Sequence, residues 1–479
     1  MTIASLAFLG FSLLVAMVYN LARPVWWRQG VLLVANGAFL AGFASPAALL
    51  PLLAFIGTSF GCLRLIQRGQ ARGGLYGAIV ALIVVLFFWL KRYSFLPQAS
   101  FLSFAYSVIG LSYIFFRAMH VIIDAHGGDL PERVRLVGYL NYVLNFTSLV
   151  SGPIQRYQDY ANMQLAEERL PLDCIVAGRA TERIATGLFK VVVLSTILHG
   201  FHQRMLLAFG GSNTTGDHIL TALGAMVGYT FYLYCNFSGY TDIVVGAARF
   251  YWLQLPENFN RPFAATSFID FWTRWHMTLS DWLKTYVYNP LVLALIARFP
   301  SAGAAPYLGV IAFFVTFFLI GLWHGQTSVF AVYGVLLGLG VSVNKLYQVA
   351  MAARLGRKPY RALTDRTWYR AAARGLTFTW FTISLVFFWG NWPLIGQLAA
   401  GLGFAGGTVA AIILLLGSGA VLTVAAAARE LCLQVRMFGA PVLLSRYSRT
   451  VWITAMSAVA VTALTLLASP APDVIYKTF

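Results

Sequence analysis

Long apolar runs dominate the hydrophobic pattern of this chain and predict helices that cross a membrane. A helix of about 20 apolar residues spans the hydrocarbon core of a bilayer. Runs of this kind recur along the whole sequence, separated by more polar loops. We expect spans near residues 3–21, 30–44, 46–66, 74–90, 101–123, 184–207, 216–248, 304–323, 327–350, 375–398, 402–428 and 450–468. The pattern therefore predicts an all-α polytopic membrane protein with about 11–13 transmembrane helices.

Three stretches interrupt this rhythm. Residues 137–152 are short and polar and end at a Gly-Pro pair that breaks a helix, so they are compatible with a re-entrant segment. Residues 153–183 are rich in charged side chains and should lie on the cytoplasmic surface. Residues 249–303 are too polar to span but rich in Trp, Tyr and Phe, which favour the membrane–water boundary. We expect re-entrant or interfacial helices on the cytoplasmic side there.

The charges of the chain predict its topology. Lys and Arg number 34 against 16 Asp and Glu, and charged residues make up only 10% of the chain, whereas soluble proteins carry about 25%. The basic residues gather near 64–72, 354–374 and 429–449, which share one side if the spans alternate. That side should be cytoplasmic, which places both termini in the periplasm of a bacterial inner membrane. Membrane topology therefore accounts for the excess of Lys and Arg over Asp and Glu, and nucleic-acid binding is not needed to explain it.

Composition adds two further expectations. The four cysteines have no spacing typical of a metal site or a disulfide framework, so we expect no metal. No internal repeat divides the chain, and we expect a single membrane-embedded domain over 1–479. Its parts would be N-terminal helices over 1–110, a core over 111–350 and C-terminal helices over 351–479.

Two histidines stand in settings that call for an explanation. His324 ends a strongly apolar run, FLIGLWHGQTS, between Gly321 and Gly325, which would let backbone or a ligand approach closely. An ionisable side chain at membrane depth is a functional candidate, although a histidine hydrogen-bonded between packed helices is an equally good explanation. His276 lies in FWTRWHMTLSDWLK, residues 271–284.

The polar residues around these histidines leave two interpretations open. Residues 272–282 have helical spacing and predict an amphipathic interfacial helix, but Arg274 and Lys284 could also bind the phosphates of a charged cofactor. Asn236 and Asp242 belong to a polar cluster at the inner end of a span. The cluster could be a packing seam, yet the Asp242 carboxylate requires a partner such as an arginine.

Several stretches together resemble the membrane-bound O-acyltransferases. They are PENFNRPF (256–263), SFIDFWTRWHMTLSDWLKTYVYNPL (267–291), GLWHG (321–325), NFSGYTD (236–242), GPIQRY (152–157) and GLFK (187–190). The branch that they resemble contains the alginate O-acetyltransferase membrane subunit and the D-alanyl transfer protein of teichoic acid. The resemblance implies a ring of helices around a central tunnel and transfer of an acyl group from a thioester to a hydroxyl.

The resemblance also implies roles for individual residues. His324, deep in the core, would be the catalytic base or a transient acyl carrier, because imidazole has a pKa near working pH. His276 would lie toward the cytoplasmic side, where the donor enters. The residues expected to contact substrate are Asn236, Asp242, Arg274, Trp275, Trp323 and Lys284.

The function expected from the resemblance is O-acetylation of an extracytoplasmic polysaccharide. Acetyl-CoA in the cytosol would be the donor substrate, with no bound cofactor, and a periplasmic partner protein would complete the transfer. One alternative is D-alanyl transfer from a carrier-protein thioester to a cell-envelope polymer. An alternative of another class is a transporter or channel without covalent chemistry.

Overall fold

A computed structural model of the chain describes residues 3–70, 73–130, 133–167, 172–301, 303–437, 440–441 and 445–466. Both chain ends, for which the sequence predicts a periplasmic location, lie outside these residues. The chain forms two compact units. The first comprises Met1–Val193, Asn236–Glu257 and Val459–Phe479, and the second comprises Leu194–Cys235 and Asn258–Ala458. The single acyltransferase domain and the central tunnel stay predictions.

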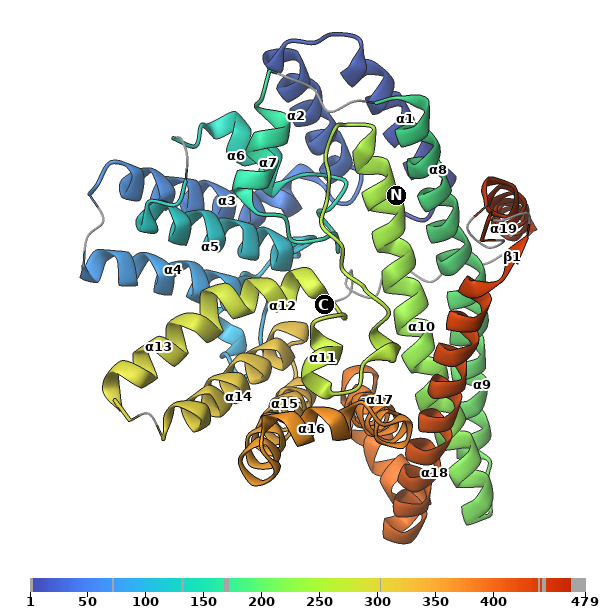
Figure 1. The fold of residues 1–479 in the computed structure, drawn as a ribbon. Coiled ribbons are helices and arrows are strands. Elements are labelled where there is room, and N and C mark those ends of the chain that lie inside the picture. The colour runs from blue at the N-terminus through green and yellow to red at the C-terminus, as the bar shows by residue number, and fades with distance from the viewer. Residues whose placement is uncertain are drawn as a thin grey trace. The chain divides into compact units, whose positions relative to one another are not determined.

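Helices from the first part of the chain build the first unit. They are α1 (Leu6–Asn20), α2 (Val25–Ala41), α3 (Pro46–Gln67), α4 (Gly74–Leu90), the short η1 (Gln98–Ser100), α5 (Leu111–Gly127), α6 (Leu136–Val143), α7 (Tyr157–Gln164) and α8 (Cys174–Leu188). Helices α3, α4 and α5 pack side by side, and α2 packs against α1 and α6 (Figure 1). The π-helix η2 (Phe189–Ser195) continues α8, and the C-terminal part of α10 (Thr215–Arg249) completes the unit.

The second unit holds α9 (Thr196–Gly210), the start of α10 and most of the later elements. These elements are η3 (Pro262–Ala264), α11 (Phe268–Trp272), α12 (Met277–Leu283), the π-helix η4 (Lys284–Tyr288), α13 (Asn289–Arg298), α14 (Ala305–His324), α15 (Ser328–Leu355), α16 (Arg357–Thr364), α17 (Thr367–Trp389), α18 (Trp392–Gln434), β1 (Arg436–Met437), β2 (Ala440–Pro441) and, as far as Ala458, α19 (Arg446–Leu466). Helix α15 packs against α14 and α17, and α17 packs against α18 (Figure 1). Strands β1 and β2 pair antiparallel.

The prediction of a polytopic helical membrane protein is confirmed. Among the described residues, seven helices are long and apolar enough to cross a membrane, and Leu6–Asn20 and Gly74–Leu90 are shorter apolar helices. Each of the twelve expected spans overlaps a helix of the structure, although the last two residues of 450–468 lie outside the described part. Apolar runs locate these helices because a helix satisfies its own backbone hydrogen bonds.

Several boundaries differ from the expected ones. The span expected over 375–398 is broken, because α17 ends at Trp389 and α18 begins at Trp392. The Asn391 side chain causes the new start, since it accepts a hydrogen bond from the Leu394 backbone at 3.0 Å and caps α18. Helix α18 then contains a non-helical residue, Gly403, at φ 59°. The span expected from residue 101 begins only at α5.

The segment that suggested a re-entrant structure is a buried connection without regular structure. After α6 ends, residues 144–155 are all buried and mostly non-helical. Arg117 on α5 donates to the carbonyl oxygens of Tyr142, Val143 and Ser148 at 2.9–3.2 Å, and also to the Ser148 hydroxyl. The Asn36 side chain accepts from the Phe146 backbone at 2.9 Å. Side chains thus replace the water that this backbone would otherwise need.

We expect Arg117→Met to destabilise the first unit strongly. The substitution leaves several buried carbonyl groups without their donor, each costing about 1–3 kcal/mol. Ser148→Ala is the matched control, because it removes only one acceptor and should cost about 1 kcal/mol. The melting temperature of each purified variant in detergent measures the difference. Equal melting temperatures for Arg117→Met and the parent chain would show that Arg117 does not hold this segment.

Candidate active site

The stretch around His276 folds as two short helices with a sharp turn between them. Helix α11 ends at Trp272 and α12 begins at Met277, so the continuous amphipathic helix expected over 272–282 is wrong. His276 itself adopts a left-handed conformation, φ 46° and ψ 50°, which few non-glycine residues adopt, although Asn, Asp and His do so most readily. The sequence has helical spacing here, and tertiary contacts produce the turn that interrupts the helix.

Asn258 holds this turn in place. Its carbonyl oxygen accepts from the Met277 backbone at 2.9 Å, and its side-chain oxygen accepts from the Thr278 hydroxyl at 2.6 Å. Phe259 and Trp275 form an isolated antiparallel bridge beside it. The PENFN stretch therefore acts as a template for the turn, and the His276 side chain is left only 1% exposed.

Trp323 brings the two candidate histidines together. The His276 ring lies 6.3 Å from the Trp323 ring, edge to face, and the His324 ring lies 4.7 Å from the same indole. Both imidazoles are buried. On its other sides His324 meets the rings of Tyr333 and Phe388, with centroids at 5.8 Å and 5.2 Å. The structure thus places two imidazoles around one indole in a largely aromatic setting.

Glycines allow the helix that carries His324 to approach its neighbour. A Cβ atom at Gly321 would overlap the Gly334 backbone of α15, and one at Gly325 would overlap the Phe330 ring. The expectation that these two glycines admit a close approach is confirmed. What approaches is α15 itself, and the contact sets where the end of α14 lies.

Burial determines the protonation state of His276. Loss of hydration disfavours the charged imidazole and lowers the pKa of His276 to about 3. The ring is therefore neutral at physiological pH, and a neutral imidazole offers one hydrogen-bond donor and one acceptor. Such a ring can orient a polar group of a substrate but brings no positive charge to it.

The other expected contact residues of the second unit have different surroundings. Trp275 packs against the rings of Phe271 and Phe381, with centroids at 5.6 Å and 5.0 Å. The Arg274 side chain pairs with Asp270 at 2.8 Å and is about one-third exposed. Lys284 is exposed at the start of η4. Among the expected contact residues, Trp323 has ring contacts with both histidines.

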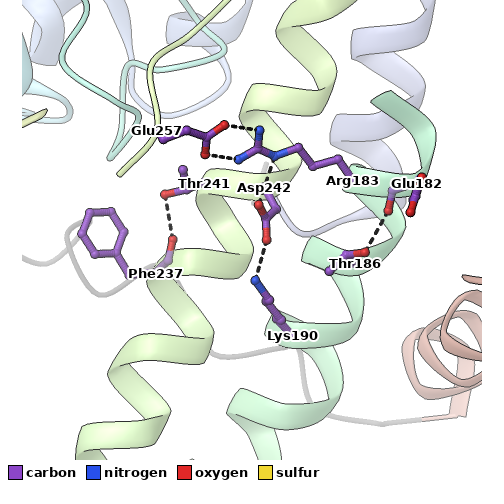
Figure 2. Close-up of polar contacts among 8 residues, drawn as sticks. All are labelled: Glu182, Arg183, Thr186, Lys190, Phe237, Thr241, Asp242 and Glu257. Atoms are coloured by element: carbon purple, nitrogen blue, oxygen red, sulfur yellow. Dashed lines mark hydrogen bonds and ion pairs between the residues drawn. The ribbon is translucent and has the colours of Figure 1, made fainter. Parts of the chain in front are cut away.

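Asp242 in the first unit has the basic partner that the sequence called for. Arg183 binds it through Nε at 3.0 Å, and Lys190 binds its other oxygen at 2.6 Å (Figure 2). Arg183 also donates to Glu257 at 2.6 Å, so one guanidinium joins two carboxylates. Gly187 and Gly239 make these pairs reachable, because a Cβ on either would overlap the opposite backbone.

Asn236 is fully buried on α10, in the first unit like Asp242. The histidines belong to the second unit.

Five residues around Asp242 and around the two histidines could not be identified from the sequence. They are Arg183, Glu257, Asn258, Tyr333 and Phe388. Glu257 and Asn258 lie in PENFNRPF, which was noted for its resemblance but not for these side chains, while Tyr333 and Phe388 lie in apolar runs that give no signal. Within the described residues, no three His, Cys, Asp or Glu side chains gather to hold a metal.

Acid should destabilise the parent chain more than His276→Asn. The unfolded chain binds a proton at His276 below about pH 6.5, whereas the folded chain does so only near pH 3. Stability that depends on the neutral ring is therefore complete above pH 6.5 and falls as the pH drops toward 3, by at most about 1.4 kcal/mol per pH unit. Asn tolerates the left-handed conformation. Melting temperatures from pH 7.5 to 4.5 test this, and a constant difference between the two chains would contradict it.

Asp242→Asn should lower the melting temperature more than Glu257→Gln. The Asp242 side chain is 15% exposed and binds two cations, whereas that of Glu257 is 52% exposed. A hydrogen bond to a charged, partly buried group contributes about 1.5–3 kcal/mol, and an exposed pair contributes about 0–1 kcal/mol. Thermal unfolding in detergent compares the two variants. A larger loss for Glu257→Gln would place the centre of the network at Glu257 instead.

Comparison with known proteins identifies the family. The family model described as MBOAT, membrane-bound O-acyltransferase family, matches residues 125–364, half of the chain. The protein named "Probable alginate O-acetylase AlgI" of Pseudomonas aeruginosa is 28% identical over 384 residues, 77% of this chain and 68% of the relative. The teichoic acid D-alanyltransferase of Bacillus subtilis (strain 168) is 29% identical over 68% of this chain and 81% of its own length. The peptidoglycan O-acetyltransferase of Helicobacter pylori is 33% identical over 44% of this chain and 38% of its own length. The matched segment contains His276, Trp323 and His324, and the chain belongs to the membrane-bound O-acyltransferase family.

Proposed function

We propose that this O-acyltransferase moves an acetyl group from cytosolic acetyl-CoA across the inner membrane toward a hydroxyl of an extracytoplasmic polysaccharide. The observation that carries the proposal is the pair of buried imidazoles around Trp323. Acyl transfer from a thioester needs a base for the hydroxyl proton. It also needs exclusion of water, which would hydrolyse the thioester.

His324 is the base in this proposal. The acceptor hydroxyl loses its proton to the imidazole while its oxygen bonds to the thioester carbonyl carbon. The carbon–sulfur bond then breaks, and the departing thiolate takes this proton from the imidazolium. In the version where His324 carries the acyl group, its ring nitrogen bonds to the carbonyl carbon and the carbon–sulfur bond breaks, which releases the thiolate. The hydroxyl oxygen then bonds to the same carbon, the carbon–nitrogen bond to His324 breaks, and the hydroxyl proton passes to the thiolate. The Tyr333 and Phe388 rings beside His324 keep this chemistry dry.

The remaining expected residues support these steps in different ways. The neutral ring of His276 can orient a polar group of the donor, and the exposed Lys284 can attract the phosphates of acetyl-CoA. Arg274, already paired with Asp270, can make a further contact through its guanidinium. The ion pairs of Asp242 favour a role in joining α8 to α10, with Asn236 buried on the same helix.

One observation favours a second candidate for the transferred acyl group, D-alanyl. The Bacillus subtilis teichoic acid D-alanyltransferase aligns with 68% of this chain and over 81% of its own length, so D-alanyl transfer from a carrier-protein thioester is the alternative. Purified chain incubated with labelled acetyl-CoA, or with a D-alanyl-loaded carrier protein, separates the two donors. Transfer from the carrier together with indifference to acetyl-CoA would overturn the acetyl proposal and keep the acyl chemistry. Membership of an acyltransferase family disfavours the transporter alternative.

His324→Ala should reduce acyl transfer by at least about 100-fold, because general-base catalysis contributes about 10²–10⁴-fold. Release or transfer of label from the reactive donor measures the rate. His126→Ala is the control, since His126 is exposed and stacks on Tyr76, and it should retain the parent rate. Parent-like turnover by a folded His324→Ala variant would remove His324 from the mechanism.

A further inference from the structure

A large cavity in the second unit has no part in the proposed acyl transfer. It has a volume of about 1060 Å³ and lies between α15, α16, α17 and the start of α11. Its lining contains two kinds of side chain. One part is aliphatic and includes Leu339, Val343 and Leu376, and the other is aromatic and polar and includes Tyr347, Tyr360 and Tyr369.

The aliphatic part opens sideways to the surface of the spanning helices. Val343 and Leu376 are 60% and 57% exposed, on α15 and α17, two helices that are apolar enough to cross a membrane. In a bilayer such exposed side chains face lipid tails. An acyl chain can therefore enter the cavity between α15 and α17 without leaving the hydrocarbon phase.

The aromatic part has the character of a membrane–water boundary. The hydroxyls of Tyr369 and Tyr347 lie 3.3 Å apart, and the Tyr347 and Tyr360 rings have centroids 6.4 Å apart. Tyrosine and tryptophan prefer the depth of the lipid headgroups. Helix α16 covers this end, with Tyr360 and Leu363 lining the cavity while Arg357 is exposed.

Positive charge is concentrated in the segment that covers that end of the cavity. Residues 354–374 hold seven Arg or Lys residues and one acid, Asp365. Asp365 is paired with Arg370 at 2.7 Å. On α16, Arg357, Lys358 and Arg361 are exposed. Basic clusters next to a spanning helix attract anionic lipid headgroups. Helix α16 therefore combines two residues that line the cavity, Tyr360 and Leu363, with exposed basic residues that attract a phosphate.

We propose that this cavity is a binding site for one anionic phospholipid, with an acyl chain between α15 and α17 and its phosphate at the basic residues of α16. The open aliphatic wall favours a lipid over a nucleotide thioester, which would enter from water. The bound lipid would touch Phe268 of α11, which also lines the cavity. Asn344 of α15 accepts from the Ile269 backbone at 3.2 Å, so the same wall holds the start of α11. The lipid therefore stabilises α11 as well as α15 and α17.

Titration of the delipidated protein in neutral detergent tests the site. The probes are phosphatidylglycerol and phosphatidylcholine with identical acyl chains, and native mass spectrometry counts the bound lipids while thermal unfolding reports stabilisation. We expect one phosphatidylglycerol to bind at least about tenfold more tightly than phosphatidylcholine. Inorganic phosphate alone should not stabilise the protein, because it lacks the acyl chain.

Two sets of variants separate the parts of the site. The triple variant Arg357→Gln, Lys358→Gln, Arg361→Gln should lose the preference for phosphatidylglycerol. The matched control Arg68→Gln, Arg133→Gln, Arg135→Gln removes three exposed charges of the first unit and should keep the preference. Val343→Trp fills the sideways opening and should weaken both lipids about equally. The melting temperature without lipid verifies that each variant folds.

Three results would overturn the proposal. They are equal affinity for the two phospholipids, equal losses in the α16 triple variant and its control, and displacement of phosphatidylglycerol by free coenzyme A. The last result would assign the cavity to a nucleotide instead. None of these measurements depends on acyl transfer, so the site and the proposed function can fail separately.

Discussion

Buried backbone outside a helix needs hydrogen-bond partners from the protein itself, and this constraint explains where many polar residues of the chain lie. A spanning helix meets the requirement internally. The buried connection after α6 cannot, and Arg117 donates to the Ser148 carbonyl within it and to the carbonyls of Tyr142 and Val143 at the end of α6. A guanidinium is suited to this task because it carries five N–H donors in a rigid plane. A polar residue in an apolar run can thus serve to bond buried backbone nearby, and this role should be considered first.

The same constraint shapes the candidate active site. The left-handed turn at His276 lies between two helices. Asn258 accepts hydrogen bonds from the Met277 backbone and the Thr278 hydroxyl, which follow the turn. With the turn in place, the imidazole meets the Trp323 indole edge to face, and the same indole contacts His324. Desolvation that keeps His276 neutral is a consequence of this packing. The residues that support the turn and the residues of the proposed chemistry therefore belong to the same short segments.

Ion pairs join stretches of the first unit that are far apart in sequence. Arg183 of α8 connects Asp242 of α10 to Glu257, and Lys190 reinforces the first contact (Figure 2). The need of Asp242 for a cationic partner could be predicted, because a carboxylate within an apolar helix is costly alone. Which cation would meet it could not be predicted. That choice depends on the close approach of α8 to α10 at Gly187 and Gly239.

The sequence by itself determined the helical class, the place of each expected span and the two histidines worth attention. These features are local: an apolar run specifies a helix because the helix bonds to itself, and a histidine in such a run is visible in isolation. Only the tertiary structure decided that the helix over 272–282 would break at His276 and that Trp323 would contact the imidazole of His276 as well as that of His324. Those outcomes depend on contacts between residues distant in the chain, such as Asn258 with Met277 or Gly321 with Gly334. Local propensity contains no information about such partners, because it depends only on residues that are near one another in the sequence.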